Sequence, residues 1–243
     1  MFSRKLSLSL AAAAASIFAA SATQASFTAT ITSSGGGGPL MLTGSSAAPA
    51  LPGTLQIGPI NETVDSFSIS NFTATSNSPS SSNEAVEVGS SIHITNTTSS
   101  AETLSINLLD DGFTAPTGSN LQVTAHGTIT WTQTDTQNSK DVVTAESVVQ
   151  GNPVAGTQTS NTLNSGTSLL DLSTYLPTAS ADLGALGSPY SLGSNLTVQL
   201  NGNDAVNVVW YSSVAAVPEP TALTLLGMSG LGALLLVGRR RKA

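Results

Sequence analysis

Apolar and polar residues alternate along much of the middle of the chain. The longest alternating run covers residues 121–132, and its apolar members are Leu121, Val123, Ala125, Ile129 and Trp131. Its other positions carry mostly threonine. A period of two places the two sets on opposite faces of a β-strand. We therefore predict a strand with one buried face, which places Trp131 in the core, and one threonine-covered face in water.

Shorter runs with the same period predict further strands. Their apolar sets are Val86, Val88, Ile92 and Ile94; Leu104, Ile106 and Leu108; Leu196, Val198 and Leu200; and Val206, Val208 and Trp210. The last two runs are separated by Asn201-Gly202-Asn203-Asp204, and Asn-Gly between alternating segments is a strong hairpin signal. A second hairpin is predicted to turn at residues 135–140. Trp210, like Trp131, is predicted to be buried.

Three segments depart from this simple pattern. Phe67 and Ile69 lie at odd positions but Phe72 and Ala74 at even ones, so we expect a bulge or break near Ser70-Asn71. Residues 35–38, 49–59, 77–83 and 151–166 have the composition of loops. Residues 168–186 carry leucines at positions 169, 172 and 176, a spacing that favours a short helix.

Together these elements predict an all-β fold. About eight or nine antiparallel strands without a β-α-β pattern favour a β-sandwich over a barrel or an α/β fold. We assign this sandwich to residues 26–216. The chain contains no cysteine, so this domain has no disulfides to support its core.

The first 25 residues have the features of a secretory signal peptide. Arg4 and Lys5 precede an apolar, alanine-rich run over residues 6–20, which ends in small residues. Cleavage is expected after Ala25, with Ala22 as the alternative. The sequence therefore predicts export through Sec-type machinery.

The last 27 residues, 217–243, form a second targeting segment. A transmembrane helix is predicted over residues 221–238, since residues 221–237 carry no charge and span about 25 Å as a helix, just enough for a bilayer core. The basic residues Arg239, Arg240, Arg241 and Lys242 follow at once and are expected to stay in the cytoplasm. The body then lies outside the cytoplasm, anchored in the inner membrane.

The motif Pro218-Glu219-Pro220, directly after Val217, precedes the predicted helix. Two prolines keep such a segment extended, which suits a processing enzyme. The order of Pro-Glu-Pro, Leu/Gly-rich span and terminal basic cluster resembles bacterial proteins with a PEP-CTERM sorting tail. That resemblance covers the tail alone. It implies processing at or near Pro218-Glu219-Pro220 by an exosortase-type membrane enzyme, and a final location at the cell surface or outside the cell.

Charge limits the partners of the exported body. Once the two ends are set aside, Lys140 is its one basic residue against thirteen acidic residues, for a net charge near −12. A surface of that sign repels phosphate backbones, which excludes nucleic acid as a partner.

No motif in the body predicts catalysis, a cofactor or a metal. His93 and His126 are the two histidines, and the alternation places both on polar strand faces. The same register puts Glu87 on the face of His93 but about 20 Å away. A G-x-S-x-G nucleophile elbow and a calcium-binding loop are absent from the sequence, and Asp110-Asp111-Gly112 and Asn203-Asp204 are interpreted as turns.

Two functions are compatible with these features. The first is a non-enzymatic protein of the cell surface or of an extracellular polysaccharide matrix, without a defined ligand site. The second is a carbohydrate-binding or adhesive module with such a site. Sugar sites need exposed aromatic rings, and because both tryptophans are predicted to be buried, the candidates are Tyr175, Tyr190 and Tyr211.

Overall fold

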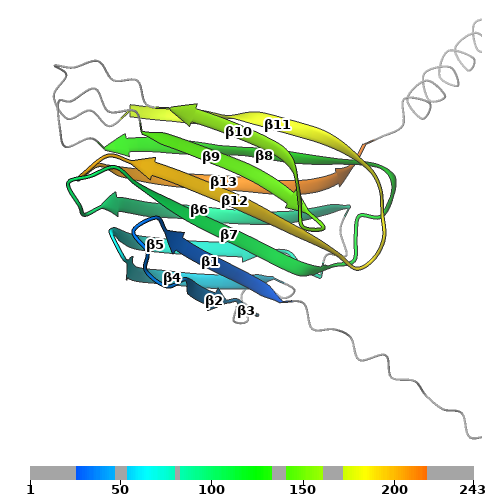
Figure 1. Cartoon of the computed structure of the whole chain (residues 1–243). Coiled ribbons are helices and arrows are strands. Elements are labelled where there is room, and N and C mark those ends of the chain that lie inside the picture. The colour runs from blue at the N-terminus through cyan, green and yellow to red at the C-terminus, as the bar shows by residue number, and fades with distance from the viewer. Residues whose placement is uncertain (1–25, 47–53, 80–82, 133–140, 161–171, 218–243) are drawn as a thin grey trace, which may run out of the picture.

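The structure is a computed structural model that describes residues 26–46, 54–79, 83–132, 141–160 and 172–217. Over these ranges it consists of antiparallel strands in two sheets that pack face to face (Figure 1), which confirms the all-β sandwich. None of the described residues form a helix that could cross a membrane. The predicted signal peptide, the helix over residues 221–238 and the basic cluster lie outside the described residues.

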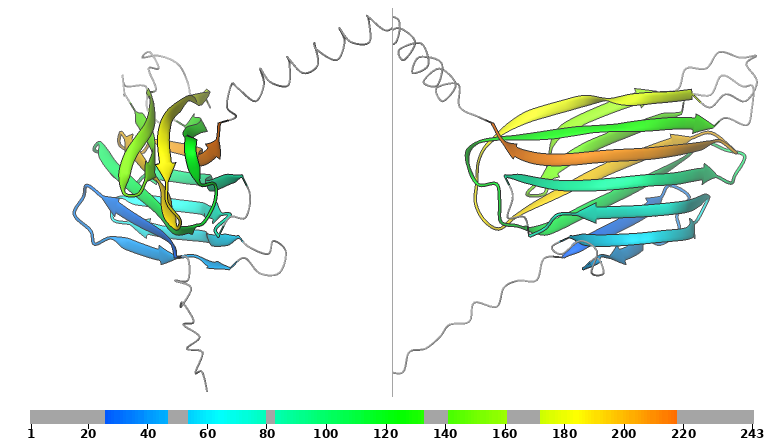
Figure 2. Two further views of the ribbon diagram at one scale, coloured as in Figure 1. Left: turned by 90° about the vertical axis from the view of Figure 1, so that its right-hand side faces the viewer. Right: turned by 180° about the vertical axis from the view of Figure 1, so that it is seen from behind.

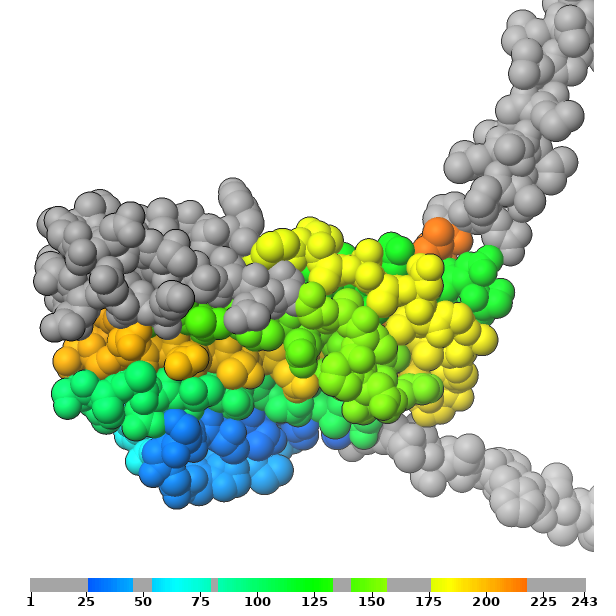
Figure 3. All heavy atoms as spheres, turned by 45° about the horizontal axis from the view of Figure 1, so that its top comes forward, coloured from blue at the N-terminus to red at the C-terminus, as the bar shows by residue number. Residues whose placement is uncertain are grey.

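The two sheets contain thirteen strands within the described ranges. In sheet order, the six-stranded sheet consists of β10 (Asn152–Ser160), β9 (Val142–Val149), β12 (Tyr190–Leu200), β7 (Glu102–Phe113), β1 (Phe27–Ser33) and β2 (Leu40–Thr43). The seven-stranded sheet consists of β11 (Leu172–Leu186), β8 (Gly118–Thr132), β13 (Ala205–Ala216), β6 (Glu84–Asn96), β5 (Phe67–Ser76), β4 (Leu55–Val64) and β3 (Ser45–Ser46). β10 and β11, the edge strands of different sheets, contact each other and cover one side of the sandwich (Figure 3).

The strand count exceeds the predicted eight or nine partly because two segments were assigned wrongly. Residues 168–186 were predicted to form a helix, but β11 occupies 172–186 and pairs along β8, from Leu172 opposite Trp131 to Leu186 opposite Gly118. Most of the predicted loop at 151–166 is strand β10. β10 forms a hairpin with β9, from Asn152 opposite Val149. β11 instead pairs with β8, a strand distant in sequence, and local propensity does not contain that information.

Both predicted hairpins are wrong. β12 lies between β9 and β7, whereas β13 lies between β8 and β6, so the turn at residues 201–204 carries the chain from one sheet to the other. β8 and β9 likewise belong to different sheets, and residues 133–140 between them lie outside the described residues. The turn itself is correct, since Asp204 N donates to Asn201 O over 3.3 Å. The alternating pattern does not distinguish the two arrangements, because strands of facing sheets and strands of one hairpin both direct their apolar side chains into the same core.

Three adjacent strands of the seven-stranded sheet carry irregularities at neighbouring positions, which we call the crease. β5 has the predicted break, because Asn71 has φ 58° and pairing with β6 lapses between Ser70 and Thr73. Beside it, Ser91 of β6 has φ 34°, and the register between β6 and β13 shifts there. On the other side, β4 shifts its register between Ile57 and Ile60. The crease therefore runs across β4, β5 and β6, and it shifts the pairing of β6 with β13.

The crease overturns the predicted faces of β6. Because of the shift at Ser91, Ile92 and Ile94 point into the core, but Val86 and Val88 point outward. Glu87, predicted on the outer face with His93, is instead completely buried between the sheets. One extra residue in a strand reverses every side chain beyond it.

The core consists of two apolar clusters. The larger cluster contains Phe27, Phe67, Phe72, Trp131 and Trp210 among its largest members, and the smaller contains Phe113, Leu121, Val123, Tyr190 and Leu192. Trp131 and Trp210 are 0% and 1% exposed, as predicted. The start of β1 and the end of β13 lie at the same end of the sandwich (Figure 2).

Candidate functional site

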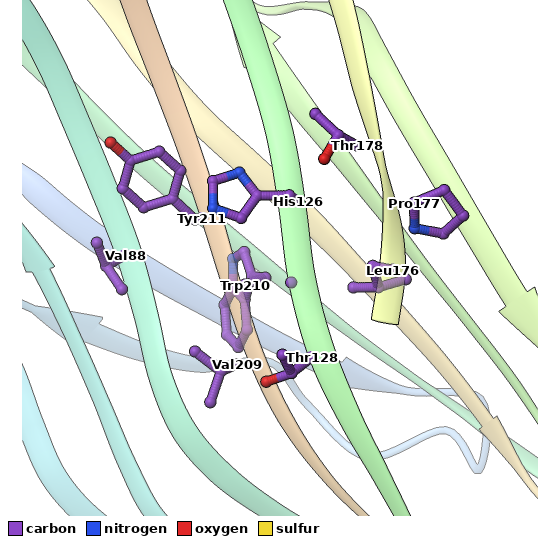
Figure 4. Close-up of a pocket in the computed structure, with 10 residues that line it drawn as sticks. Val88, His126, Thr128, Leu176, Pro177, Thr178, Val209, Trp210 and Tyr211 are labelled. Atoms are coloured by element: carbon purple, nitrogen blue, oxygen red, sulfur yellow. The ribbon is translucent and has the colours of Figure 1, made fainter. Parts of the chain in front are cut away.

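A pocket of about 520 Å³ opens on the seven-stranded sheet, next to the crease (Figure 4). Four neighbouring strands line it: Val88 of β6, Val209 to Tyr211 of β13, His126 to Thr128 of β8, and Leu176 to Thr178 of β11. Pockets lined mainly by apolar and aromatic side chains with a few polar groups are the usual form of small-ligand sites. This pocket has that composition.

A glycine and a bulge shape the side of the pocket formed by β11. A Cβ at Gly127 would lie 2.8 Å from Cδ1 of Leu176 and 2.4 Å from the carbonyl oxygen of Val209, so this close packing requires glycine. The register between β11 and β8 shifts after Leu176, and Pro177 and Thr178 are exposed there. The shift therefore presents a proline ring and a hydroxyl group at the rim of the pocket.

An aromatic pair forms the opposite side. Tyr211 of β13 and His126 of β8 are direct cross-strand neighbours, and their ring centroids lie 4.5 Å apart at an angle of 35°. Tyr211 Oη donates a hydrogen bond to Glu84 Oε1 over 2.9 Å. Partial burial, followed by this hydrogen bond, raises the pKa of Tyr211, so its hydroxyl stays protonated. In Figure 4 the two rings lie side by side.

The two histidines lie on polar strand faces, as predicted, but in different surroundings. His126 is exposed at the pocket. His93 Nδ1 lies 3.0 Å from Asn207 Oδ1, and its Nε2 lies 3.2 Å from Thr95 Oγ1. Both ring nitrogens of His93 are thus engaged in the sheet surface. Over the described ranges, His, Asp and Glu side chains do not gather in threes able to hold a metal ion.

The other two tyrosine candidates are not part of this pocket. Tyr190 is 3% exposed, and its hydroxyl donates to the carbonyl oxygen of Ala115 over 3.0 Å, so the prediction that it is available to a sugar is wrong. Its apolar neighbour is Phe113, with ring centroids 5.7 Å apart. Tyr175 belongs to β11, but its side chain lies outside the described part of the chain.

Behind the pocket, the sheets enclose a buried polar layer, which we define as Glu87, Ser194, Ser147 and Ser212. Trp210 Nε1 donates to Ser194 Oγ over 2.8 Å, and Ser194 Oγ donates to Glu87 Oε1 over 2.5 Å. The hydroxyls of Ser147 and Ser212 lie 2.7 Å apart. Sequence reasoning missed this layer, because it placed Glu87 outside.

Glu87 is protonated at neutral pH for the most part. Its burial raises the pKa of the carboxyl group to about 8, the hydrogen bond from Ser194 opposes this shift, and the carboxylate of Asp110 adds to it. Burial likewise raises the pKa of Asp110. Glu87 and Asp110 are both completely buried, so their carboxyl groups cannot contact a solute and are not candidates for surface chemistry.

The acidic turn predictions are half right. Asp110 to Gly112 lie inside strand β7, where Gly112 N donates to Asp110 Oδ1 over 3.0 Å, so they are not a turn. Asp111 instead accepts hydrogen bonds from the backbone nitrogen and hydroxyl of Ser26, which attaches the start of β1. Asn203-Asp204 is part of a turn, as predicted.

Of the predicted sorting residues, the structure describes Val217 alone. Val217 follows β13 directly, and its backbone nitrogen donates to the carbonyl oxygen of Asn120 over 2.8 Å. Pro218, Glu219, Pro220 and the residues 239–242 lie outside the described residues, as do the signal cleavage positions Ala22 and Ala25.

Comparisons with known proteins leave the family open. No protein-family model matches the chain, and no curated protein matches it. Among solved structures, TmCBM61 in complex with β-1,4-galactotriose is 9% identical, with a TM-score of 0.31 over 60% of this chain and 86% of that one. The N-terminal cellulose-binding domain of Cellulomonas fimi β-1,4-glucanase C is 16% identical, with a TM-score of 0.25 over 53% and 80%. These values are too low to indicate what this chain binds.

Proposed function

We propose that the protein is an exported, non-enzymatic carbohydrate-binding protein of the cell surface or extracellular matrix. The observation that carries this proposal is the Tyr211–His126 pair beside an open pocket on a sheet face. Sugar rings have an apolar face that stacks on aromatic rings and polar edges that form hydrogen bonds. The pocket favours the second of the two hypotheses drawn from the sequence, a module with a defined ligand site.

The side chains around the Tyr211–His126 pair are of the chemical types that contact sugars. The hydrogen bond to Glu84 restrains the Tyr211 ring, so little side-chain entropy is lost when a sugar stacks on it. Pro177 and Val88 extend the apolar surface to either side, and Thr128 and Thr178 are exposed hydroxyl donors and acceptors. Polar contacts of this kind give orientation, and the stacked area gives most of the affinity.

The same pocket argues for binding without hydrolysis. Glycosidases of the usual type place two carboxyl groups about 5 to 9.5 Å apart on either side of the scissile bond. The lining of this pocket includes no Asp or Glu. Glu84 beside it is engaged by Tyr211, and Glu87 is enclosed by the sheets.

Affinity electrophoresis tests the binding site. We expect the full chain, solubilised in mild detergent, to be retarded by at least one soluble neutral polysaccharide, and Tyr211→Ala to weaken binding at least about tenfold. Met41→Ala is the control, because Met41 is a 71% exposed apolar residue on edge strand β2 of the other sheet. Unchanged retardation of Tyr211→Ala would refute this site.

The sorting tail completes the proposal. Because β13 ends at Ala216, cleavage at or near Pro218-Glu219-Pro220 leaves every described strand in the released body. The chain would be exported by Sec-type machinery, held in the inner membrane by residues 221–238 and released by an exosortase-type enzyme. Glu219→Ala should then accumulate at full length in the inner membrane, detected by intact-mass analysis. A mature wild-type species that retains residues 239–242 would refute processing.

A further inference from the structure

The pocket lies on a row of residues that crosses the seven-stranded sheet. In strand register, His126 lies opposite Tyr211, Tyr211 opposite Val88, Val88 opposite Thr75, and Thr75 opposite Gln56. We call these five residues the cross-strand row. Each is exposed or partly exposed. The strands that carry them lie side by side in Figures 1 and 2.

Among the described residues, the row continues to both edges of the seven-stranded sheet. Four spacings of about 4.8 Å between neighbouring strands give about 19 Å from His126 to Gln56. Beyond Gln56 lies the exposed Ser45 of β3, the edge strand, and beyond His126 lie the exposed Pro177 and Thr178 of β11, the other edge strand. A site that continues to both edges of a sheet allows a chain to enter and leave.

The chemistry of the row changes along its length. His126, Tyr211 and Val88 offer ring faces and a branched apolar group, whereas Thr75 and Gln56 offer a hydroxyl and an amide. A polysaccharide presents the matching sequence of C–H faces and hydroxyl groups repeatedly along its chain. One end of the row therefore provides stacking, and the other provides hydrogen bonds to further sugar units.

The charge of the protein indicates which class of polysaccharide the row would bind. The described residues include no Lys or Arg, so uronate or sulfate groups would find no guanidinium or ammonium partner along the row. Glu84 adds a carboxyl group beside Tyr211. The body as a whole has a net charge near −12, which repels a polyanion at a distance.

We infer that the ligand is the interior of a neutral polysaccharide chain that lies across the strands, from the Tyr211 pocket over Val88 to Thr75 and Gln56. This inference rests on the proposed function and deepens it. It assigns two residues outside the pocket, Thr75 and Gln56, to the binding of further sugar units. Affinity must then increase with chain length, and the increase must depend on those two residues.

The test uses the full chain in detergent. Affinity electrophoresis with β-glucan, galactan, galactomannan and arabinoxylan selects the best neutral polysaccharide, with polygalacturonate and alginate as anionic probes. Calorimetry then compares its oligosaccharides of two and six units. We expect the longer oligosaccharide to bind at least about tenfold more tightly. The double variant Thr75→Ala/Gln56→Ala should lose most of this gain and keep the affinity for the shorter one.

Thr63→Ala/Ser68→Ala is the matched control. These residues are direct partners on the same two strands, also outward-facing, but outside the row. They should leave both affinities unchanged. Equal affinity for the two lengths, preference for an anionic probe, or an unaffected Thr75/Gln56 double variant would overturn the inference while leaving a glycan-binding pocket. Failure of the wild type to bind any probe would instead refute the proposed function and the inference with it.

Discussion

The two tryptophans occupy regions of the core that the sequence does not distinguish. Trp131 lies within the larger apolar cluster, and its Nε1 has no hydrogen-bond partner in the described part of the chain. Trp210 stacks parallel to Phe72 at 6.5 Å, and its Nε1 donates to Ser194, which donates to Glu87. One indole is held by packing alone, whereas the other also anchors a buried polar network.

This difference marks the boundary between the two apolar clusters of the core. On β12, Ser194 lies between Leu192 of the smaller cluster and Leu196 of the larger cluster. On β13, Ser212 separates Trp210 from Val214 in the same way. The polar layer therefore divides the two clusters. Because a slipped strand would place these groups against apolar neighbours without partners, we interpret the layer as a device that fixes strand register.

Removal of each indole is expected to have the largest effect on stability and tests the difference between the two tryptophans. Trp210→Ala should cost about 5 kcal/mol, because it leaves a large cavity and also removes the donor to Ser194. Trp131→Ala should cost about 3 kcal/mol, from the cavity alone. Urea unfolding of the full chain, followed by circular dichroism, measures both. Losses of equal size would mean that the polar layer adds nothing.

Much of this core follows from the sequence, but its polar part does not. Alternation predicted the inward faces of β7, β8, β12 and β13 and both tryptophans. It failed at Glu87, because Val86, Val88, Ile92 and Ile94 are all even-numbered and the shift at Ser91 is not visible in the pattern. At the pocket, Tyr211 was a candidate, but its neighbour His126 comes from a distant segment. Pairings of that kind are set by the whole fold.

A change of pH acts on the polar layer through Glu87. The folded pKa of Glu87 is about 8, against an ordinary value of 4.5, so between these pH values the folded chain holds a proton that the unfolded chain releases. The contribution of Glu87 to stability should therefore be fully present below pH 4.5 and be lost as the pH rises to 8, by up to about 5 kcal/mol at about 1.4 kcal/mol per pH unit. The raised pKa of Asp110 acts in the same direction.

The variant Glu87→Gln separates the two acids. An amide is neutral at every pH and keeps an oxygen to accept the hydrogen bond from Ser194. Urea midpoints of this variant should vary much less between pH 5 and pH 8 than those of the wild type. A wild type that is equally stable at both pH values would show that Glu87 is not protonated in the folded state.

A methyl group added beside Trp210 tests the packing of this indole with less disturbance than its removal. A Cβ at Gly89 would lie 2.2 to 2.4 Å from three carbon atoms of the Trp210 indole, so Gly89→Ala should displace this ring at a cost of about 1–3 kcal/mol. Gly187→Ala is the control, because nothing lies within 4 Å of its Cβ position. The displacement should also shift the tryptophan fluorescence. A Gly89→Ala protein as stable as the control would mean that the indole packs loosely.

The smallest and most selective change replaces each indole by a phenyl ring. Both substitutions leave a small cavity, but Trp131→Phe also removes a buried N–H group without a partner, and the relief of that desolvation cost offsets the lost packing. We expect a change within about 1 kcal/mol. Trp210→Phe leaves Ser194 Oγ without its donor and Glu87 with a weakened partner, so it should cost about 1–3 kcal/mol more than Trp131→Phe. The double variant Trp210→Phe/Ser194→Ala tests the cause of this excess. If the hydrogen bond explains it, Trp210→Phe must cost less when Ser194 is already alanine. An unchanged cost would assign the excess to packing against Phe72.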